Sequence, residues 1–154
     1  MREQYRNKKW AGLMKHERKG TCLCGAVEIS VNANATKIGA CHCTICRRLS
    51  GGSAFLALHG DDKLEATGAE HIGRCRSSDW AERGFCTKCG TPLFYHLTVG
   101  TMEHFYSAGL FLEDDADFKV VQEIFVEQKP DYYAFSDENS ERKTAEQVFA
   151  EANE

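Results

Sequence analysis

The eight cysteines are the feature that most constrains the fold of this 154-residue chain. Most of them fall into three closely spaced groups: a C-x-C pair, a C-x-C-x₂-C triplet and a C-x₂-C pair. The first 20 residues hold no apolar run of the kind found in export signals, so we expect a protein of the reducing cytoplasm. Disulfides are rare there, and closely spaced cysteines are more typical of metal ligands. The groups are Cys22 and Cys24; Cys41, Cys43 and Cys46; and Cys86 and Cys89, with Cys75 outside them.

The first and last groups predict one closed metal site. Cys22 and Cys24 are two residues apart, so they point to the same face of an extended strand. Cys86 and Cys89 form a turn in which Gly90 permits the tight backbone that lets amide groups approach the sulfurs. Two such pairs supply the four thiolates of a tetrahedral structural zinc site. The alternative is that these cysteines are buried as small apolar side chains without a metal.

The middle group predicts a second and more open site. Cys41, Cys43 and Cys46 place three thiolates at the end of a strand and in the turn after it. Three protein ligands are typical of a catalytic zinc, whose fourth position is left for water or substrate. A fourth protein ligand makes the site structural, and Cys75 is the main rival because it belongs to no group. His42 lies between two ligands, so in an extended chain its side chain points away from the metal. The other histidines considered as a fourth ligand are His59, His96 and His104.

Basic and hydroxyl residues follow the triplet directly. Arg47, Arg48 and Ser50 are therefore candidates for balancing the negative charge of a three-thiolate site, or for holding a substrate carboxylate. The alternative is that the two arginines form an ordinary solvated surface pair. Weaker candidates for the same role are Ser77, Ser78 and Arg83.

Composition and charge favour one domain and argue against nucleic-acid binding. A chain of this length with 42% hydrophobic residues can bury a single core. Residues 1–19 carry seven Lys and Arg against two acids, residues 20–112 carry eight against eight, and residues 113–154 carry four against thirteen. Nucleic-acid-binding domains usually have a basic surface over the folded body, which here is neutral. No apolar run reaches the ~18 residues that span a bilayer, so we expect no membrane partner, while assembly into a homo-oligomer stays open.

Short apolar runs separated by Gly and Asp predict a mainly β domain of antiparallel strands. Apolar residues at i, i+3, i+4 and i+7 over residues 145–152 predict a short amphipathic C-terminal helix. A shorter helix is predicted over residues 10–14, where the apolar side chains share one face. The runs that predict strands are Val27 to Val31, Ala54 to Leu58, Leu93 to Val99, Phe105 to Phe111 and Val120 to Val126.

Four segments in this order resemble one protein family. They are G-T-C-L-C-G from Gly20, C-H-C-T-I-C-R-R from Cys41, S-S-D-W-A-E-R-G-F-C-T-K-C-G-T-P-L from Ser77 and F-V-E-Q-K-P from Phe125. The pattern is similar to that of the glutathione-dependent formaldehyde-activating enzyme family, which also includes centromere protein V. The likeness runs from about Gly20 to Asp137. We therefore expect a basic extension over 1–19, a zinc-binding domain over 20–137 and an acidic helix or tail over 138–154.

The resemblance implies small antiparallel sheets in a β-tent arrangement. It also implies a structural zinc on the first and last cysteine groups and a second zinc, associated with glutathione, on the middle group. These ligands match the cysteine groups described above, residue by residue. Two features depart from the family: Asp131, Tyr132 and Tyr133 stand where relatives often have tryptophan after the K-P, and Cys75 is not expected.

The resemblance, together with the open three-cysteine site, implies a zinc-dependent carbon–sulfur lyase of the S-(hydroxymethyl)glutathione synthase type. Such an enzyme joins a thiol such as glutathione to a small aldehyde such as formaldehyde, and Cys41, Cys43 and Cys46 are its expected catalytic residues. The open zinc is expected to lower the pKa of the thiol and to hold it beside the carbonyl. Three thiolates leave a negative centre that is a poor Lewis acid, so a redox reaction of Cys43 with the substrate thiol is a secondary hypothesis. The non-catalytic alternatives are a zinc-stapled binding module and a thiol or metal sensor.

Overall fold

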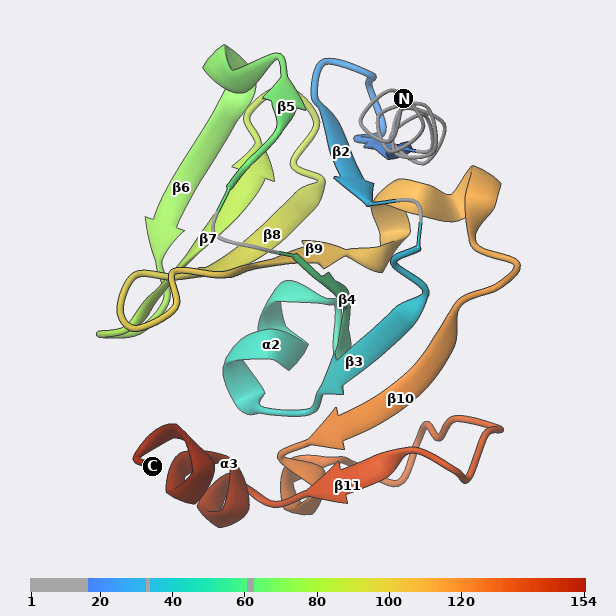
Figure 1. Cartoon of the computed structure of the whole chain (residues 1–154), viewed down its shortest axis with the longest axis vertical. Helices are drawn as coiled ribbons and strands as arrows, with labels where there is room; N and C mark the ends of the chain where they lie inside the picture. The colour runs from blue at the N-terminus through green and yellow to red at the C-terminus, as the bar shows by residue number, and fades with distance from the viewer. Residues whose placement is uncertain (1–16, 33, 61–62) are drawn as a thin grey trace, which may run out of the picture.

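The computed structural model describes residues 17–32, 34–60 and 63–154, and these residues form two β-sheets (Figure 1). The smaller sheet has three strands in the order β1-β2-β5. The larger has eight strands in the order β11-β10-β3-β4-β9-β8-β7-β6. In Figure 1, β6 to β8 lie at the upper left and β3, β10 and β11 at the lower right, with the helix α2 between them.

The elements are short and follow one another closely along the chain. The strands are β1 (Glu17–Thr21), β2 (Glu28–Asn32), β3 (Lys37–Cys41), β4 (Phe55–His59), β5 (Ala66–Thr67), β6 (Ile72–Arg76), β7 (Ala81–Cys86), β8 (Pro92–Leu97), β9 (His104–Ser107), β10 (Lys119–Ile124) and β11 (Glu141–Lys143). The α-helices are α2 (Thr44–Leu49) and α3 (Ala145–Ala152). The 3₁₀-helices are η1 (Ala69–His71), η2 (Ala108–Asp114) and η3 (Val126–Gln128).

The mainly β class and the C-terminal helix predicted from the sequence are confirmed. Neighbouring strands pair antiparallel, except that β10 pairs parallel with both β3 and β11. In this pairing Ile124 lies opposite Cys41, and Lys143 lies opposite Ile124. The C-terminal third of the chain is therefore held beside the middle cysteine group.

One apolar core joins the two sheets. Ile29 of the smaller sheet belongs to the same buried cluster as Leu58 and Phe94 of the larger sheet. Phe94 lies over Gly84 of the neighbouring strand, where an added Cβ atom would be 2.2 Å from the ring. A glycine in β7 is therefore required by the aromatic side chain that covers it.

The predicted apolar runs coincide with β2, β4, β8 and β10 to within a few residues. The run over 105–111 was only partly correct, because the strand ends at Ser107 and the chain turns into η2. Leu110 and Phe111 of η2 are buried in the core, so their apolar character reflects burial in a 3₁₀-helix instead of strand pairing.

The C-terminal helix α3 has a well-defined start and a small apolar contact. Thr144 and Gln147 form a capping box, in which each side chain accepts a hydrogen bond from the other residue's backbone N–H. Phe149 packs edge-on against Trp80 at 6.1 Å and against Phe125 at 5.8 Å between ring centroids. The helix therefore bridges the β6–β7 turn and the end of β10.

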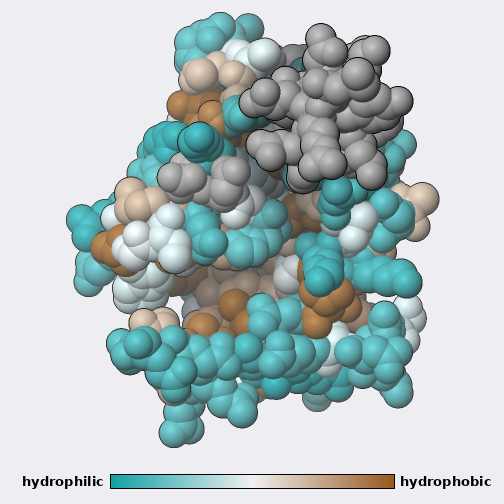
Figure 2. Space-filling model, in the orientation of Figure 1, coloured by the Kyte–Doolittle hydropathy of each residue, from teal (hydrophilic) through white to brown (hydrophobic). Residues whose placement is uncertain are grey.

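The surface near α2 differs in character from the C-terminal edge. Figure 2 shows a hydrophilic lower edge, where Figure 1 places β11 and α3, and apolar side chains in the hollow above it, where Figure 1 places α2. Ile45 and Leu49 of α2 are 39% and 42% exposed.

Within the described part of the chain, no helix is long and apolar enough to cross a bilayer. The helix predicted over residues 10–14 lies outside the described residues.

Gly68 fixes the position of the turn between β1 and β2. Its φ of +73° is a left-handed conformation, which favours glycine. A Cβ atom at Gly68 would lie 1.8 Å from the carbonyl oxygen of Ala26. Ala26 belongs to the turn that carries Cys22 and Cys24, so this close backbone contact helps to hold that turn in place.

Candidate metal centres and active site

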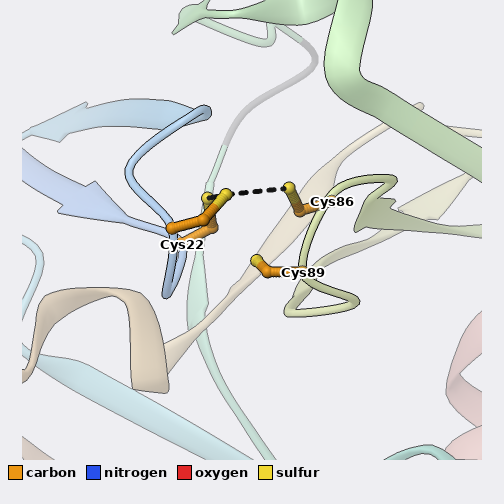
Figure 3. Close-up of side chains that lie close together, drawn as sticks. Cys22, Cys86 and Cys89 are labelled. Atoms are coloured by element: carbon orange, nitrogen blue, oxygen red, sulfur yellow. Dashed lines mark hydrogen bonds between the residues drawn. The ribbon is translucent and has the colours of Figure 1, made fainter.

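The first and last cysteine groups lie on two turns that face each other (Figure 3). In the first turn, the amide of Cys22 donates to the Val27 carbonyl and that of Gly25 to the Cys22 carbonyl. In the second, the amide of Cys86 donates to the Thr91 carbonyl and that of Gly90 to the Cys86 carbonyl. Both turns are therefore closed by a bond from the first cysteine to the residue five positions later, while the glycine amide reaches back three residues in the first turn and four in the second. The first pair lies in this turn, between β1 and β2. The placement in a strand that the spacing alone had suggested is therefore wrong.

The four sulfur atoms have the spacing of a tetrahedral metal site. All four Sγ atoms lie within 4.8 Å of one another. The Sγ atom of Cys24 is 3.7 Å from that of Cys22 and 3.8 Å from that of Cys86. A regular tetrahedron with zinc–sulfur bonds of about 2.3 Å has edges of about 3.8 Å. The sulfurs of Cys22, Cys24, Cys86 and Cys89 therefore fit a four-thiolate zinc site.

Hydrogen bonds to the Cys22 and Cys89 sulfurs favour their ionised form, whereas the pKa of Cys24 is raised to about 11, with its contacts to the other cysteines among the causes. The amide of Val27 lies 3.3 Å from the Cys22 sulfur. Thr91 accepts a hydrogen bond from the amide of Leu23, and its hydroxyl lies 3.1 Å from the Cys89 sulfur, so it links the two turns. The hydrogen bond from Thr91 lowers the pKa of Cys89 to about 5. Metal ligation requires such ionised thiols.

The middle cysteine group is formed where β3 meets α2. Cys41 is the last residue of β3, Cys43 is the N-cap of α2 and Cys46 lies in its first turn. Their sulfurs lie within 4.8 Å of one another. In residues 17–32, 34–60 and 63–154, no other Cys, His, Asp or Glu ligand atom joins this group. The arrangement therefore fits a metal held by three thiolates.

The thiols of this group differ in pKa. Hydrogen bonds from Cys41 and then Cys46 hold the pKa of the Cys43 thiol far below its ordinary range. The same contact with Cys43 raises the pKa of the Cys41 thiol. The backbone amide of Cys46 also lies 3.4 Å from the Cys43 sulfur, as expected for a helix N-cap. Cys43 is therefore a more acidic thiol than Cys41.

Arg83 is the charged group that contacts this cluster. Its Nη2 atom lies 3.3 Å from the sulfur of Cys46, and its side chain is only 7% exposed. Its Nε atom donates to the Ser77 hydroxyl at 3.2 Å. The guanidinium group also lies over the rings of Tyr95 and Phe55, at 4.5 and 5.5 Å from their centroids. A buried cation is thus fixed against a sulfur ligand.

An aromatic wall, formed by Phe55, Tyr95 and Phe105, lies on one side of the same sulfurs. Cys46 is buried in a cluster with Phe55 and Ala57, and Tyr95 and Phe105 pack against this cluster. Tyr95 and Phe105 meet edge to face, with their centroids 5.7 Å apart. Apolar groups on one side of the sulfurs lower the local dielectric constant and strengthen the interaction with Arg83.

His42 points away from the sulfurs, as predicted. It is fully buried, and its Nε2 atom lies 2.8 Å from a carboxylate oxygen of Glu123. Its Nδ1 atom lies 2.7 Å from the hydroxyl oxygen of Tyr133. Both ring nitrogens are therefore occupied outside the cysteine cluster. The other histidines considered as ligands, His59, His96 and His104, do not join the cluster either.

The remaining candidates lie at other places around the centre. Arg47 donates to the carbonyl oxygens of Gly52 and Gln128 and to the hydroxyl of Tyr132. Arg48 is exposed on α2. The hydroxyl of Ser50 is buried without a hydrogen-bond partner beside a cavity of about 420 Å³. Contact of these three residues with a substrate carboxylate stays a prediction. Ser78 also has a buried hydroxyl without a partner.

Cys75 lies in β6 opposite Arg83 and is exposed. Its sulfur does not join the group formed by Cys41, Cys43 and Cys46. All eight cysteines are free thiols. The geometry therefore favours the open three-cysteine site over a site closed by Cys75.

Comparison with known protein families gives a match that spans both cysteine clusters. A family model described as glutathione-dependent formaldehyde-activating enzyme matches residues 17–128. The chain belongs to the glutathione-dependent formaldehyde-activating enzyme family. The resemblance noted in the sequence is thereby confirmed.

Individual relatives of this family cover most of the chain. An uncharacterised lyase from Schizosaccharomyces pombe is 33% identical over 124 residues, which cover 80% of this chain and 89% of the relative. A Halomonas elongata protein, provisionally named a glutathione-dependent formaldehyde-activating enzyme, is 28% identical over 136 residues, covering 80% of this chain and 84% of the relative. A solved Rhodobacter sphaeroides structure matches with a TM-score of 0.51 and 23% identity, over 82% of this chain and 99% of that chain. That structure supports the fold alone.

Three residues near the three-cysteine cluster make contacts that the sequence did not predict: Arg83 was only a weak candidate, Tyr133 was noted as a departure from the family without a site role, and Glu123 was not singled out. Arg83 stands in β7 beside the buried residues Ala81 and Gly84, and a basic residue within such an apolar strand is a usable signal. Glu123 and Tyr133 reach His42 from 81 and 91 residues away in the sequence. Contacts of this kind depend on the parallel β10–β3 pairing and have no local sequence signal.

The two centres are predicted to differ in their effect on stability. Cys89→Ser removes a ligand of the centre that joins the two turns, and we expect it to lower the melting temperature by more than about 10 °C. Cys43→Ser should lower it by only a few degrees, because β3 and α2 are also held by β10 and β4. Differential scanning calorimetry of the two zinc-loaded variants measures this. Equal losses would contradict the assignment of distinct structural and open centres.

Proposed function

We propose that this protein joins a thiol such as glutathione to a small aldehyde such as formaldehyde, giving S-(hydroxymethyl)glutathione. The observation that carries the proposal is the convergence of three sulfurs, without a fourth protein ligand among the described residues, in a chain of this family. The reaction is balanced without an oxidant. The thiol sulfur forms a bond to the carbonyl carbon, the C=O π pair moves to oxygen, and that oxygen takes up the proton that the thiol releases.

Zinc is the metal that best suits both donor sets, since all ligands are thiolates in a tetrahedral spacing. Cys22, Cys24, Cys86 and Cys89 are proposed to hold a structural ion. Cys41, Cys43 and Cys46 are proposed to hold a second ion, which supplies Lewis-acid chemistry and an open position for a thiol when it is bound. The proposed compartment is the reducing cytoplasm, where cysteines stay out of disulfides and can bind metal.

Arg83 offsets the excess negative charge that three thiolates bring to such a site. Three thiolates outweigh the two positive charges of a zinc ion, so a further anionic sulfur is repelled. The guanidinium group at 3.3 Å from the Cys46 sulfur adds a positive charge at the centre. Because Arg83 is 7% exposed, water screens this charge only weakly. We propose that Arg83 makes the centre electrically neutral and able to accept a substrate thiolate.

The aromatic wall of Phe55, Tyr95 and Phe105 is proposed to exclude water from one side of the reacting groups. Exclusion of water strengthens the interactions of charged groups at the site. It also limits competing hydration of the aldehyde. Orientation of the thiolate and the carbonyl beside each other supplies much of the rate enhancement. The chain then needs no separate general base, because solvent on the other side of the centre carries the proton from the thiol to the carbonyl oxygen.

Metal content and catalysis test the proposal together. The wild-type protein is expected to hold two zinc ions per chain, Cys43→Ser one and Cys75→Ser two, measured by inductively coupled plasma mass spectrometry. Exchange NMR with ¹³C-formaldehyde and glutathione measures the rate of adduct formation. We expect acceleration by wild type and Cys75→Ser and none by Cys43→Ser.

Other outcomes select the other candidate functions. Loss of a zinc ion in Cys75→Ser, with no acceleration by the wild type, contradicts the open site and favours a closed structural module. Two zinc ions and glutathione binding without acceleration favour a thiol or metal sensor. A mixed disulfide of Cys43 with glutathione, detected by mass spectrometry as a turnover species, favours redox chemistry.

Substitutions at Arg83 test the role of charge. Arg83→Gln should weaken glutathione binding by tenfold or more, because hydrogen bonds to charged groups contribute about 1.5–3 kcal/mol. Arg83→Lys should lose less, since it keeps the charge but not the planar fork. Isothermal titration calorimetry on zinc-loaded protein measures both. Arg76→Gln, on the exposed strand β6, is the matched control. Wild-type affinity in Arg83→Gln would show that the charge is not needed.

A further inference from the structure

Tyr132 and Tyr133 contact the two ends of residues 42–52, the stretch of chain that carries Cys43 and Cys46. The two tyrosines lie in residues 129–140, between η3 and β11, where the backbone has turns and irregular structure only. Tyr132 and Tyr133 are also the residues that depart from the family pattern. Neither is explained by the proposed chemistry, since neither contacts a sulfur in the described contacts.

Tyr133 acts on the residue between the first two ligands. Its hydroxyl is 2.7 Å from Nδ1 of His42, and the two rings stack at a centroid distance of 5.6 Å. The opposite ring nitrogen faces Glu123, whose other oxygen accepts hydrogen bonds from Ser140 at 2.7 Å and Arg142 at 3.3 Å. Burial raises the pKa of Glu123, but the hydrogen bonds from Ser140 and His42 outweigh it and lower that pKa. The ionised carboxylate accepts a hydrogen bond from Nε2–H, so in the neutral imidazole Nδ1 accepts a hydrogen bond from the tyrosine hydroxyl.

Tyr132 acts on the other end of the same segment. Its hydroxyl donates to the carbonyl oxygen of Gly52 at 2.6 Å and accepts from Arg47 at 2.6 Å. Arg47 also donates to the Gly52 carbonyl at 3.1 Å, and its guanidinium group lies 5.7 Å from the Tyr132 ring centroid. These three residues therefore close the loop that follows α2.

The segment between these two anchors needs such support. It contains α2, which has only six residues and is too short to be stable alone. Cys43 and Cys46 are ligands on this helix, so any fraying of α2 separates their sulfurs. Three ligands hold a metal less firmly than four, so the open centre depends more on how rigidly its ligands are placed.

We propose that Tyr132 and Tyr133 form a clamp that holds residues 42–52 and thereby sets how long the metal stays in the three-cysteine centre. Tyr133 fixes the start of this segment through His42, and Tyr132 fixes its end through Gly52 and Arg47. The two tyrosines are positioning residues. This inference rests on the proposed second metal centre.

The rate of zinc release to a chromogenic chelator tests the clamp. Wild-type protein with two zinc ions is expected to release one ion quickly, from the three-cysteine centre, and one slowly. Tyr133→Phe and Tyr132→Phe each remove one hydroxyl group, and each should accelerate the fast phase about fivefold. The double variant should accelerate it by at least the product of the two. The slow phase should be unchanged in all of them.

Tyr106→Phe is the matched control, because its hydroxyl donates to the Lys63 carbonyl away from both clusters. Its release rates should equal those of the wild type. A cobalt(II)-loaded Tyr133→Phe protein should also show altered thiolate charge-transfer bands from the open centre, a change that general loss of stability does not produce.

Wild-type fast phases in both tyrosine variants would overturn the clamp while leaving the second metal centre intact. Acceleration of both phases by similar factors would also overturn it, because it would indicate general loosening of the fold. A wild-type protein with a slow phase only would overturn the second metal centre, and the clamp with it.

Discussion

The structure depends on the approach of two turns whose thiols would otherwise repel one another when ionised. Cys22 and Cys24 stand between the strands of the smaller sheet, and Cys86 and Cys89 stand between β7 and β8 of the larger sheet. Sulfur atoms 3.7 to 3.8 Å apart cannot all carry negative charge without a cation between them. A metal ion held at this position would link the two sheets directly, beside the shared apolar core to which Cys22 and Cys86 belong.

The second cluster uses the same type of ligand for a different purpose. Its three sulfurs lie on one short segment, so a metal there does not join distant parts of the chain. The protein supplies instead a cation at Cys46, an aromatic wall and a hydrogen-bonded histidine behind the ligands. These features would stabilise a charged and under-coordinated metal, which binding of an external thiol requires. The proposed division into one closed and one open centre thus rests on where the two cysteine groups lie in the fold.

The sequence predicted both clusters because ligand spacing is a local property. It also predicted strands such as β4 and β10, where apolar alternation is clear, and the helix α3. It did not predict β6 and β7, because their residues follow other constraints. Gly84 is required by the ring of Phe94 that covers it, and β6 is largely exposed.

The surroundings of the open centre were harder to predict. The parallel pairing of β10 with β3 brings Glu123 to His42, and the return of the chain brings Tyr133 to the same ring. Such contacts join residues more than 80 positions apart, and nothing in the local sequence marks them. Arg83 was considered from the sequence, but only the burial of its strand position shows why it matters.

The central claim is that one metal centre is closed and the other is open to a thiol. Titration of the cobalt(II)-loaded protein with glutathione, followed by thiolate-to-cobalt charge-transfer absorption, tests it most directly. Cobalt at a closed four-thiolate site keeps its spectrum, whereas cobalt at an open site gains a thiolate ligand and changes its spectrum. We predict two cobalt ions per chain and a spectral change that saturates at one glutathione per chain. A spectrum that glutathione does not alter, with two cobalt ions bound, would contradict the open centre.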